Sequence, residues 1–329
     1  MNIEPYDILD LVHGALYTAI TEQGEIRFAR FTEEQKENYA RKEEKFVLRC
    51  NSSSSIILDF YSDTNHFSFE AELITATSQS CGAFDLLVDN VLIDSVPVKV
   101  DTCRTISLNL PAGEHRITVY LPWNTATVLR HFEIDEGASL IPIEKGLRIL
   151  SIGDSITQGY TAAHPAMTYV NCMARRLNAE VLNQGVGGYQ FFEESLNGAP
   201  DWQPDLITLA YGTNDFAHIR TAKEYETQVR TYMQKLTATY PDTPILAITP
   251  IYRGDKPVST IIKGKDYTFF DAMEILHGVF AEFQQVKVLD GLSFFPHHAD
   301  FFVSDFLHPN DLGFSLYAQA VSDEILKMG

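Results

Sequence analysis

The sequence has little cysteine and little positive charge. Its four cysteines, Cys50, Cys81, Cys103 and Cys172, include no CxxC pair, so their spacing favours neither a zinc site of cysteine ligands nor a disulfide framework. We expect free, mostly buried thiols in a reducing compartment. With 25 Lys and Arg against 44 Asp and Glu, the formal net charge is −19. This balance argues against a nucleic-acid partner, which requires a basic surface, and against binding to an anionic membrane surface.

Long apolar runs are also missing. No stretch of 18 apolar residues occurs, so no membrane-spanning helix is predicted. The N-terminal residues MNIEPYDILDLVHGALY lack the basic leader, apolar core and cleavage site of a signal peptide. These features predict a cytoplasmic protein that acts on neutral or small molecules, and no feature of the sequence fixes an oligomeric state.

What is present points to a folded chain of two domains. The hydrophobic fraction of 45% over 329 residues is typical of a globular, core-forming protein. From about residue 46 to 135, apolar runs such as KFVLRC, SSIILDFYS and HFSFEAELITAT alternate with short turns. This pattern predicts an antiparallel β-sandwich of the jelly-roll kind over residues 1–140. The charged segment 32–45 is predicted to be a solvated loop or a short exposed helix.

From residue 147 the pattern changes to strands that alternate with helices. Strands are predicted at LRILSIG (147–153), AEVLNQGV (179–186), DLITLAYG (205–212), PILAITP (244–250) and VKVLDG (286–291). Helices are predicted near 166–178, 221–240, 269–284 and 310–327. This alternation predicts a doubly wound parallel sheet over residues 147–329, so the fold class is α/β, with 135–146 as the linker.

Polar clusters follow several of these strands. They are GDSITQG with Ser155, NQGVGGYQ with Gly185, Gly187 and Gly188, YGTND with Asn214 and Asp215, and DFLHPND with Asp305 and His308. In an open parallel sheet, ligands bind at the carboxyl ends of the strands, so we expect the clusters to meet at one edge. Taken alone, each cluster also fits a structural role: Ser155, for instance, could cap a helix.

Together the clusters hold the groups that acyl transfer requires. A serine hydroxyl is a weak nucleophile until a base takes its proton, and a histidine titrates in the right range to do so. Asp305, three residues before His308, could hold the imidazole in one tautomer. The N–H groups of Ser155 and Gly188 and the Asn214 amide could stabilise the oxyanion of the tetrahedral intermediate.

The four clusters resemble, in the same order, the signature blocks of the SGNH hydrolases, also called GDSL esterases and lipases, with Ile156 where the family nickname has leucine. The resemblance implies a flavodoxin-like catalytic domain without a cofactor. It implies that Ser155 is the nucleophile, that His308 is the base and that Asp305 holds the His308 ring in its orientation. It also implies that Gly188 and Asn214 donate hydrogen bonds to the oxyanion. Gly188 rather than Gly187 follows from the family spacing after Asn183. The α/β-hydrolase elbow G-x-S-x-G is excluded, because Thr157 stands where its second glycine would be.

Other conspicuous residues have simpler interpretations. Asp154 and Asp215 are expected to bond turn amides beside the site. His297 and His298 lack a third ligand at a suitable spacing, so no metal site is predicted. Trp123 and Trp202 fit core packing better than stacking on a sugar. The basic segment 252–267 could shape the substrate mouth or form a plain surface loop.

A sandwich ahead of an SGNH domain resembles the layout of two-domain carbohydrate esterases. We therefore expect a serine esterase that removes short acyl groups, acetyl above all, from a small-molecule or oligosaccharide ester. A broad lipase, arylesterase, thioesterase or acyltransferase would use the same groups. An alternative of another class is a carbohydrate-binding protein with a vestigial hydrolase domain.

Overall fold

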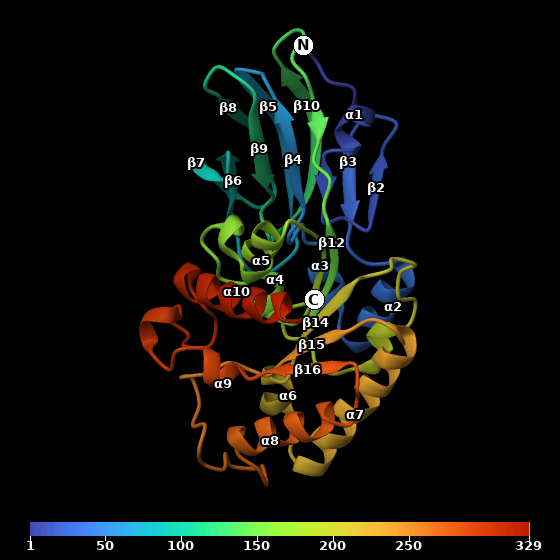
Figure 1. Cartoon of the computed structure of the whole chain (residues 1–329), viewed down its shortest axis with the longest axis vertical. Helices are drawn as coiled ribbons and strands as arrows, with labels where there is room; N and C mark the ends of the chain where they lie inside the picture. The colour runs from blue at the N-terminus through green and yellow to red at the C-terminus, as the bar shows by residue number, and fades with distance from the viewer. Residues whose placement is uncertain (329) are drawn as a thin grey trace.

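The computed structural model describes residues 1–328 and contains two antiparallel sheets and one parallel sheet (Figure 1). One antiparallel sheet has the order β2 (Tyr17–Ile20), β3 (Ile26–Ala29), β10 (Thr125–Ile134), β5 (His66–Thr75) and β8 (Thr102–Asn109). The other has the order β1 (Val12–His13), β4 (Ile57–Ser62), β9 (His115–Tyr120), β6 (Cys81–Val88) and β7 (Val91–Lys99), and β11 (Ile141–Pro142) also pairs with β4.

These two sheets form the predicted β-sandwich. Phe67, Phe69 and Leu73 lie at alternate positions of β5 and all pack in the core between the sheets, as the two-residue period of a strand requires. Phe60 and Phe84 come from the opposite sheet into the same core. The short helix α1 (Pro5–Leu9) precedes the first strand.

One prediction for the N-terminal half is wrong. The run KFVLRC, predicted as a strand, lies in helix α3 (Glu44–Cys50), and its buried residues Phe46 and Cys50 are four positions apart, which is a helical period. Segment 32–45, predicted as a solvated loop or a short exposed helix, is mainly helix α2 (Glu33–Lys42), whose capping box joins Thr32 and Gln35 and which buries Gln35, Asn38 and Tyr39. Short apolar runs do not distinguish helix from strand, so the error came from a signal that is ambiguous by nature.

The parallel sheet has the order β13 (Ala179–Gly185), β12 (Leu147–Gly153), β14 (Leu206–Ala210), β15 (Ile245–Ile248) and β16 (Val286–Leu289). Every predicted strand is present, and the order 2-1-3-4-5 is that of flavodoxin-like folds. Helices α5 (Tyr169–Leu177) and α10 (Asp311–Leu326) cover one face, and α7 (Ala222–Thr239) and α8 (Phe269–Phe280) cover the other (Figure 1). Shorter helical segments are α4 (Ser155–Gln158), α6 (Thr213–His218), α9 (Gly291–Phe294), η1 (Pro165–Met167), η2 (Glu193–Leu196) and η3 (Ala299–Phe301).

The two halves of the chain are packed against each other. Tyr39 and Phe46, from α2 and α3, belong to the same hydrophobic core as α7 and α8 and contact Tyr189, with ring centroids 4.3 and 5.0 Å from its own. Segment 135–146 also contributes β11 to the sandwich. The division of the chain at residues 140–147 therefore stays a prediction, with residues 31–50 packed on the C-terminal side.

The cysteines and the helices bear on two further expectations from the sequence. The four cysteines are unpaired, but Cys81 and Cys103 are exposed, so the expectation of mostly buried thiols is wrong for them. Within residues 1–328, no helix combines the length and the apolar character needed to cross a membrane.

Candidate active site

Ser155 stands at the first position of α4, directly after β12. The cap of this helix is Asp154, whose Oδ1 accepts a hydrogen bond from the N–H of Ile156 at 3.0 Å. The helix passes very close to the end of β13, since a Cβ on Gly185 would lie 2.3 Å from the N of Gln158. Only a glycine fits there. Because Asp154 supplies the cap, the Ser155 hydroxyl is left for another partner.

That partner is His308. Its Nε2 lies 2.8 Å from Ser155 Oγ, and its Nδ1 lies 2.6 Å from Asp305 Oδ2. The other oxygen of Asp305 accepts hydrogen bonds from the backbone N–H groups of Leu307 and His308, both at 2.9 Å. Partial burial alone would raise the pKa of Asp305, but the interactions with His308 and the hydrogen bond from Leu307 together outweigh it and lower the pKa. Asp305 is therefore an anion at neutral pH and fixes one ring orientation.

The three groups predicted to stabilise an oxyanion lie at the same edge of the sheet. Within residues 1–328, the backbone N–H groups of Ser155 and Gly188 have no hydrogen-bond acceptor. Asn214 Nδ2 contacts Asp154 Oδ2 at 3.1 Å and the Tyr189 carbonyl oxygen at 3.2 Å. Ser155, Gly188 and Asn214 follow β12, β13 and β14, whose last residues are in register. They meet where the strand order reverses, the usual ligand position in such sheets.

These groups line an open cleft of about 210 Å³. Its walls are Arg49, Ser155, Tyr160, Gly187, Gly188, Asn214, Leu307 and His308. Sequence analysis predicted no role for Arg49, Tyr160 or Leu307. Tyr160 contacts the His308 ring, with centroids 4.8 Å apart, and its hydroxyl accepts a hydrogen bond from Gln79 Nε2 at 2.9 Å. The positions of Tyr160, next to Gly159 of the first signature block, and of Leu307, between Asp305 and His308 in the last block, offered a signal in the sequence, and Arg49 had none.

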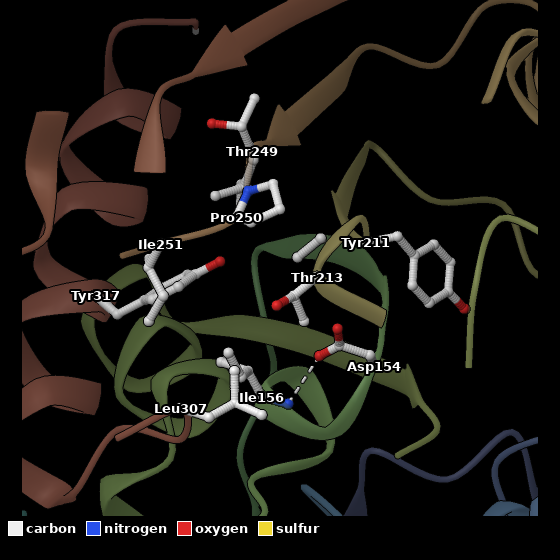
Figure 2. A pocket seen from close by; sticks show the side chains of 11 residues that line it. Asp154, Ile156, Tyr211, Thr213, Thr249, Pro250, Ile251, Leu307 and Tyr317 are labelled. Atoms are coloured by element: carbon white, nitrogen blue, oxygen red, sulfur yellow. Dashed lines mark hydrogen bonds between the residues drawn. The ribbon is translucent and has the colours of Figure 1, made fainter. Parts of the chain in front are cut away.

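A second, smaller cavity adjoins the cleft. It measures about 20 Å³, enough for about one water molecule. Figure 2 shows its lining side chains, with Ile156, Ile251, Leu307 and Tyr317 on its apolar side and Asp154 and Thr213 opposite. Neither Ser155 nor His308 lines it. Leu307 lines both spaces, so its side chain is part of the wall between them.

Two buried carboxyls support the site, as the sequence predicted. Asp154 bonds the Ile156 N–H, and Asp215 Oδ1 accepts from the Phe191 N–H at 2.9 Å. Burial raises the pKa of each of these carboxyls to about 7, because a low-dielectric surrounding disfavours the charged form.

The remaining candidates lie outside the cleft. Trp123 is buried and donates to the Ala162 carbonyl, and Trp202 stacks with the Arg148 guanidinium at 4.4 Å, so packing is the role of both. His297 stacks on Tyr252 and bonds the Leu292 carbonyl.

In the part of the chain that the structure describes, no three His, Cys, Asp or Glu side chains are placed to share a metal ion. In segment 252–267, Arg253 bonds the Thr213 carbonyl and the Gly254 N–H bonds the Phe306 carbonyl. The segment thus braces α6 and the loop that carries His308 without lining the cleft.

The sequence profile of the GDSL-like lipase/acylhydrolase family matches residues 151–316, which include all four signature blocks. The chain belongs to the GDSL-like lipase/acylhydrolase family. This membership and the fold identify an SGNH ester hydrolase. No curated protein matches this sequence.

Solved structures extend the likeness of this GDSL-like hydrolase to both halves of the chain. A salicylyl-acyltransferase from a tetracycline biosynthetic pathway has a TM-score of 0.80 at 22% identity, covering 97% of this chain and 94% of its own. A family two carbohydrate esterase from Clostridium thermocellum, in complex with cellohexaose, has a TM-score of 0.67 at 18% identity, covering 96% and 98%. Another from Cellvibrio japonicus has a TM-score of 0.65 at 18% identity, covering 100% and 97%. At these identities the likeness concerns the fold.

Proposed function

We propose that this GDSL-like hydrolase removes short acyl groups, acetyl above all, from carbohydrate esters through an acyl-serine intermediate. The observation that carries the proposal is the hydrogen-bonded chain from Ser155 Oγ to His308 Nε2 and from His308 Nδ1 to Asp305, at 2.8 and 2.6 Å. Both distances lie within the range in which a base can take a proton from a nucleophile. The reaction needs no cofactor.

The proposed reaction has two halves. Ser155 Oγ attacks the ester carbonyl carbon while His308 Nε2 takes its proton, and Asp305 stabilises the imidazolium. The oxyanion of the tetrahedral intermediate accepts hydrogen bonds from the N–H groups of Ser155 and Gly188 and from Asn214 Nδ2, which exchanges its contact with Tyr189 for the oxyanion. The intermediate collapses as His308 protonates the leaving alcohol. Water then attacks the acyl-serine by the same route in reverse.

The size of the site supports a short acyl group. The cleft of about 210 Å³ is below the roughly 300–1,000 Å³ of typical ligand pockets. The apolar cavity beside it, which Leu307 also lines, is about 20 Å³ and too small for an alkyl chain. A long acyl chain would therefore have to lie in solvent, which gives it no hydrophobic gain on binding.

The carbohydrate part of the proposal rests on two features. The cleft presents the hydroxyl group of Tyr160, which suits an alcohol rich in hydroxyl groups. The carbohydrate esterase from Clostridium thermocellum, crystallised with cellohexaose, shares the fold over nearly its whole length. A small-molecule or oligosaccharide ester is therefore the substrate that we propose.

The test is hydrolysis of p-nitrophenyl esters from acetate to octanoate by the wild type and by Ser155→Ala, followed by acetylated sugars. We expect acetate activity that falls with chain length and disappears in the variant. The matched control is Ser151→Ala, since Ser151 lies in the same strand–helix unit but not in the cleft. A preference for octanoate, or activity that survives Ser155→Ala, would contradict the proposal.

Acyl transfer is a second candidate, favoured by the likeness to the salicylyl-acyltransferase over 97% of the chain. In that reaction an alcohol replaces water in the second half. Adding a sugar or alcohol acceptor to the ester assay separates the two activities. If transfer product exceeds hydrolysis product at millimolar acceptor, transferase is the better description, whereas hydrolysis that is unaffected by acceptors would exclude it.

A further inference from the structure

Arg49, from the N-terminal half of the chain, reaches the glycine turn of the active site. It is the next-to-last residue of α3, and its Nη1 donates a hydrogen bond to the Gly187 carbonyl oxygen at 2.5 Å. Its Cδ and the Cβ of Ser155 both lie 3.6 Å from the position that a Cβ on Gly187 would occupy. The guanidinium therefore borders the same glycine as the nucleophile.

The carbonyl that Arg49 holds belongs to the peptide unit whose N–H is that of Gly188. Residues 186–189 form a β-turn closed by a 3.0 Å hydrogen bond from the Tyr189 N–H to the Val186 carbonyl. Gly188 has φ +77°, and Gly187 is not among the residues with positive φ, which is the pattern of a type II turn. Types I and II differ by a rotation of the central peptide of about 180°. The orientation of this one peptide thus decides which way the Gly188 N–H points.

Nothing in the turn itself selects that orientation, because two adjacent glycines have little conformational preference. The hydrogen bond from Arg49 does select it. In the observed orientation the carbonyl meets the guanidinium, and the Gly188 N–H points to the opposite side of the peptide, without an acceptor within residues 1–328. In the flipped orientation two donors, this N–H and the guanidinium, would face each other.

Arg49 is itself firmly held. Its backbone carbonyl accepts a hydrogen bond from Arg30 Nη2 at 3.0 Å, and Arg30 is buried and also bonds the Ser52 carbonyl and the Asn183 carbonyl. Gln158 completes the connection, since its Oε1 accepts from the Gly187 N–H at 2.8 Å while its Nε2 donates to Ser52 Oγ at 3.0 Å. Both sides of Gly187 are therefore tied to the N-terminal half.

The Arg49 side chain has no acidic partner. Within residues 1–328, no carboxylate oxygen lies within 4.0 Å of its guanidinium, and partial burial lowers its pKa. A half-buried cation without a counter-ion is costly unless it makes charge-assisted hydrogen bonds. The bond to the Gly187 carbonyl is the one that the structure provides.

We propose that Arg49 is a positioning residue of the oxyanion hole: it locks the Gly187–Gly188 peptide so that the Gly188 N–H faces the reacting carbonyl. The charged donor on the carbonyl also polarises the peptide and makes its N–H a stronger donor. The N-terminal half then contributes to catalysis. This inference rests on the proposed function, which uses Gly188 as an oxyanion donor.

The kinetic test compares Arg49→Met, Arg49→Lys and the control Lys45→Met, which removes an exposed cation from the same helix. We expect Arg49→Met to lower kcat by about 10- to 100-fold with KM changed less than about twofold, since one preorganised oxyanion donor is worth about 10²–10³. Arg49→Lys should retain more activity, and added guanidinium should partly restore Arg49→Met. A raised KM at unchanged kcat would overturn the proposal and make Arg49 a substrate-binding residue.

A second measurement does not depend on activity. The chain has 19 glycines but a single adjacent pair, Gly187–Gly188, so labelling glycine with ¹³C′ and ¹⁵N gives one HNCO correlation for this peptide. We expect Arg49→Met to shift both the Gly187 ¹³C′ and the Gly188 ¹⁵N resonances, whereas Lys45→Met leaves them in place. An unchanged correlation in Arg49→Met would overturn the inference. Failure of the proposed function would appear separately, as a wild type that hydrolyses no ester.

Discussion

His308 Nε2 lies 2.8 Å from Ser155 Oγ, although 153 residues separate the two in the chain. Ser155 is fixed by the end of a buried strand and by the Asp154 cap, while His308 lies on the loop between η3 and α10. That loop is held by Asp305, which accepts two backbone N–H groups as well as the imidazole. The contact between the two side chains thus depends on the rigid strand end that holds Ser155 and on the hydrogen-bonded loop that holds His308.

The first prediction separates the two members of the Asp305–His308 pair. His308→Ala should lower kcat/KM by about 10⁴-fold or more, because no other base is placed at Ser155. Asp305→Asn should lower kcat/KM less, by about 10- to 1,000-fold, because the Asp305 side chain is 42% exposed and water can take over part of its role. Both are measured on p-nitrophenyl acetate. Equal losses would mean that the carboxylate is as necessary as the imidazole.

The second prediction concerns Asn214. Asn214→Ala should lower kcat by about 10²–10³-fold with little change in KM, because the amide acts on charge that develops only in the transition state. Asn109→Ala removes an exposed amide of the sandwich and is the control. Steady-state kinetics on a short ester measure both constants. A rise in KM without a loss of kcat would show that the amide binds the ground state instead.

The third prediction concerns Leu307, which lines both the cleft and the small apolar cavity. Leu307→Ala should join the two spaces and give an acyl chain an apolar wall formed by Ile156 and Ile251. Each methylene buried there is worth about 0.8 kcal/mol, or roughly fourfold in kcat/KM. We therefore expect the preference to shift from acetate toward butyrate and hexanoate. A chain-length profile that stays parallel to that of the wild type would contradict this role.

The fourth prediction is a pH dependence of stability caused by Asp215. Its Oδ1 accepts from Phe191 and Gln228, its Oδ2 has no partner within residues 1–328, and burial raises its pKa to about 7. Between about pH 4 and pH 7 the folded state keeps a proton that the unfolded chain has released. The free energy of unfolding therefore falls as pH rises through this window and levels off above it.

Asp215→Asn should remove that contribution and make the decline shallower, leaving the part caused by Asp154, whose pKa burial also raises to about 7. Urea unfolding at pH 5 and pH 8 would measure the difference. Asp242→Asn, an exposed position on the loop before β15, is the matched control and should follow the wild type. If Asp215→Asn declines as steeply with pH as the wild type, then Asp215 is not the titrating group.

Much of the fold followed from local pattern. The five parallel strands and the helices α5, α7, α8 and α10 were predicted near their observed bounds, because buried strands and amphipathic helices have distinct periods. The sequence pattern also indicated Ser155 and His308, because polar residues that follow parallel strands meet at one edge of the sheet. The KFVLRC run was the exception, because six residues are too few to separate a period of 2 from one of 3.6.

Tertiary structure alone decided how the two halves cooperate. Arg49 lies 138 residues before the carbonyl that it binds, and neither Arg49 nor Arg30 has a local pattern that distinguishes it from a surface arginine. Their partners are backbone carbonyls, which every residue carries and which leave no trace in the sequence. The sequence by itself determined the strands, the helices and the immediate surroundings of Ser155, because these depend on side-chain type and spacing. The orientation of one glycine peptide depends on contacts between distant segments, and only the folded chain brings those segments together.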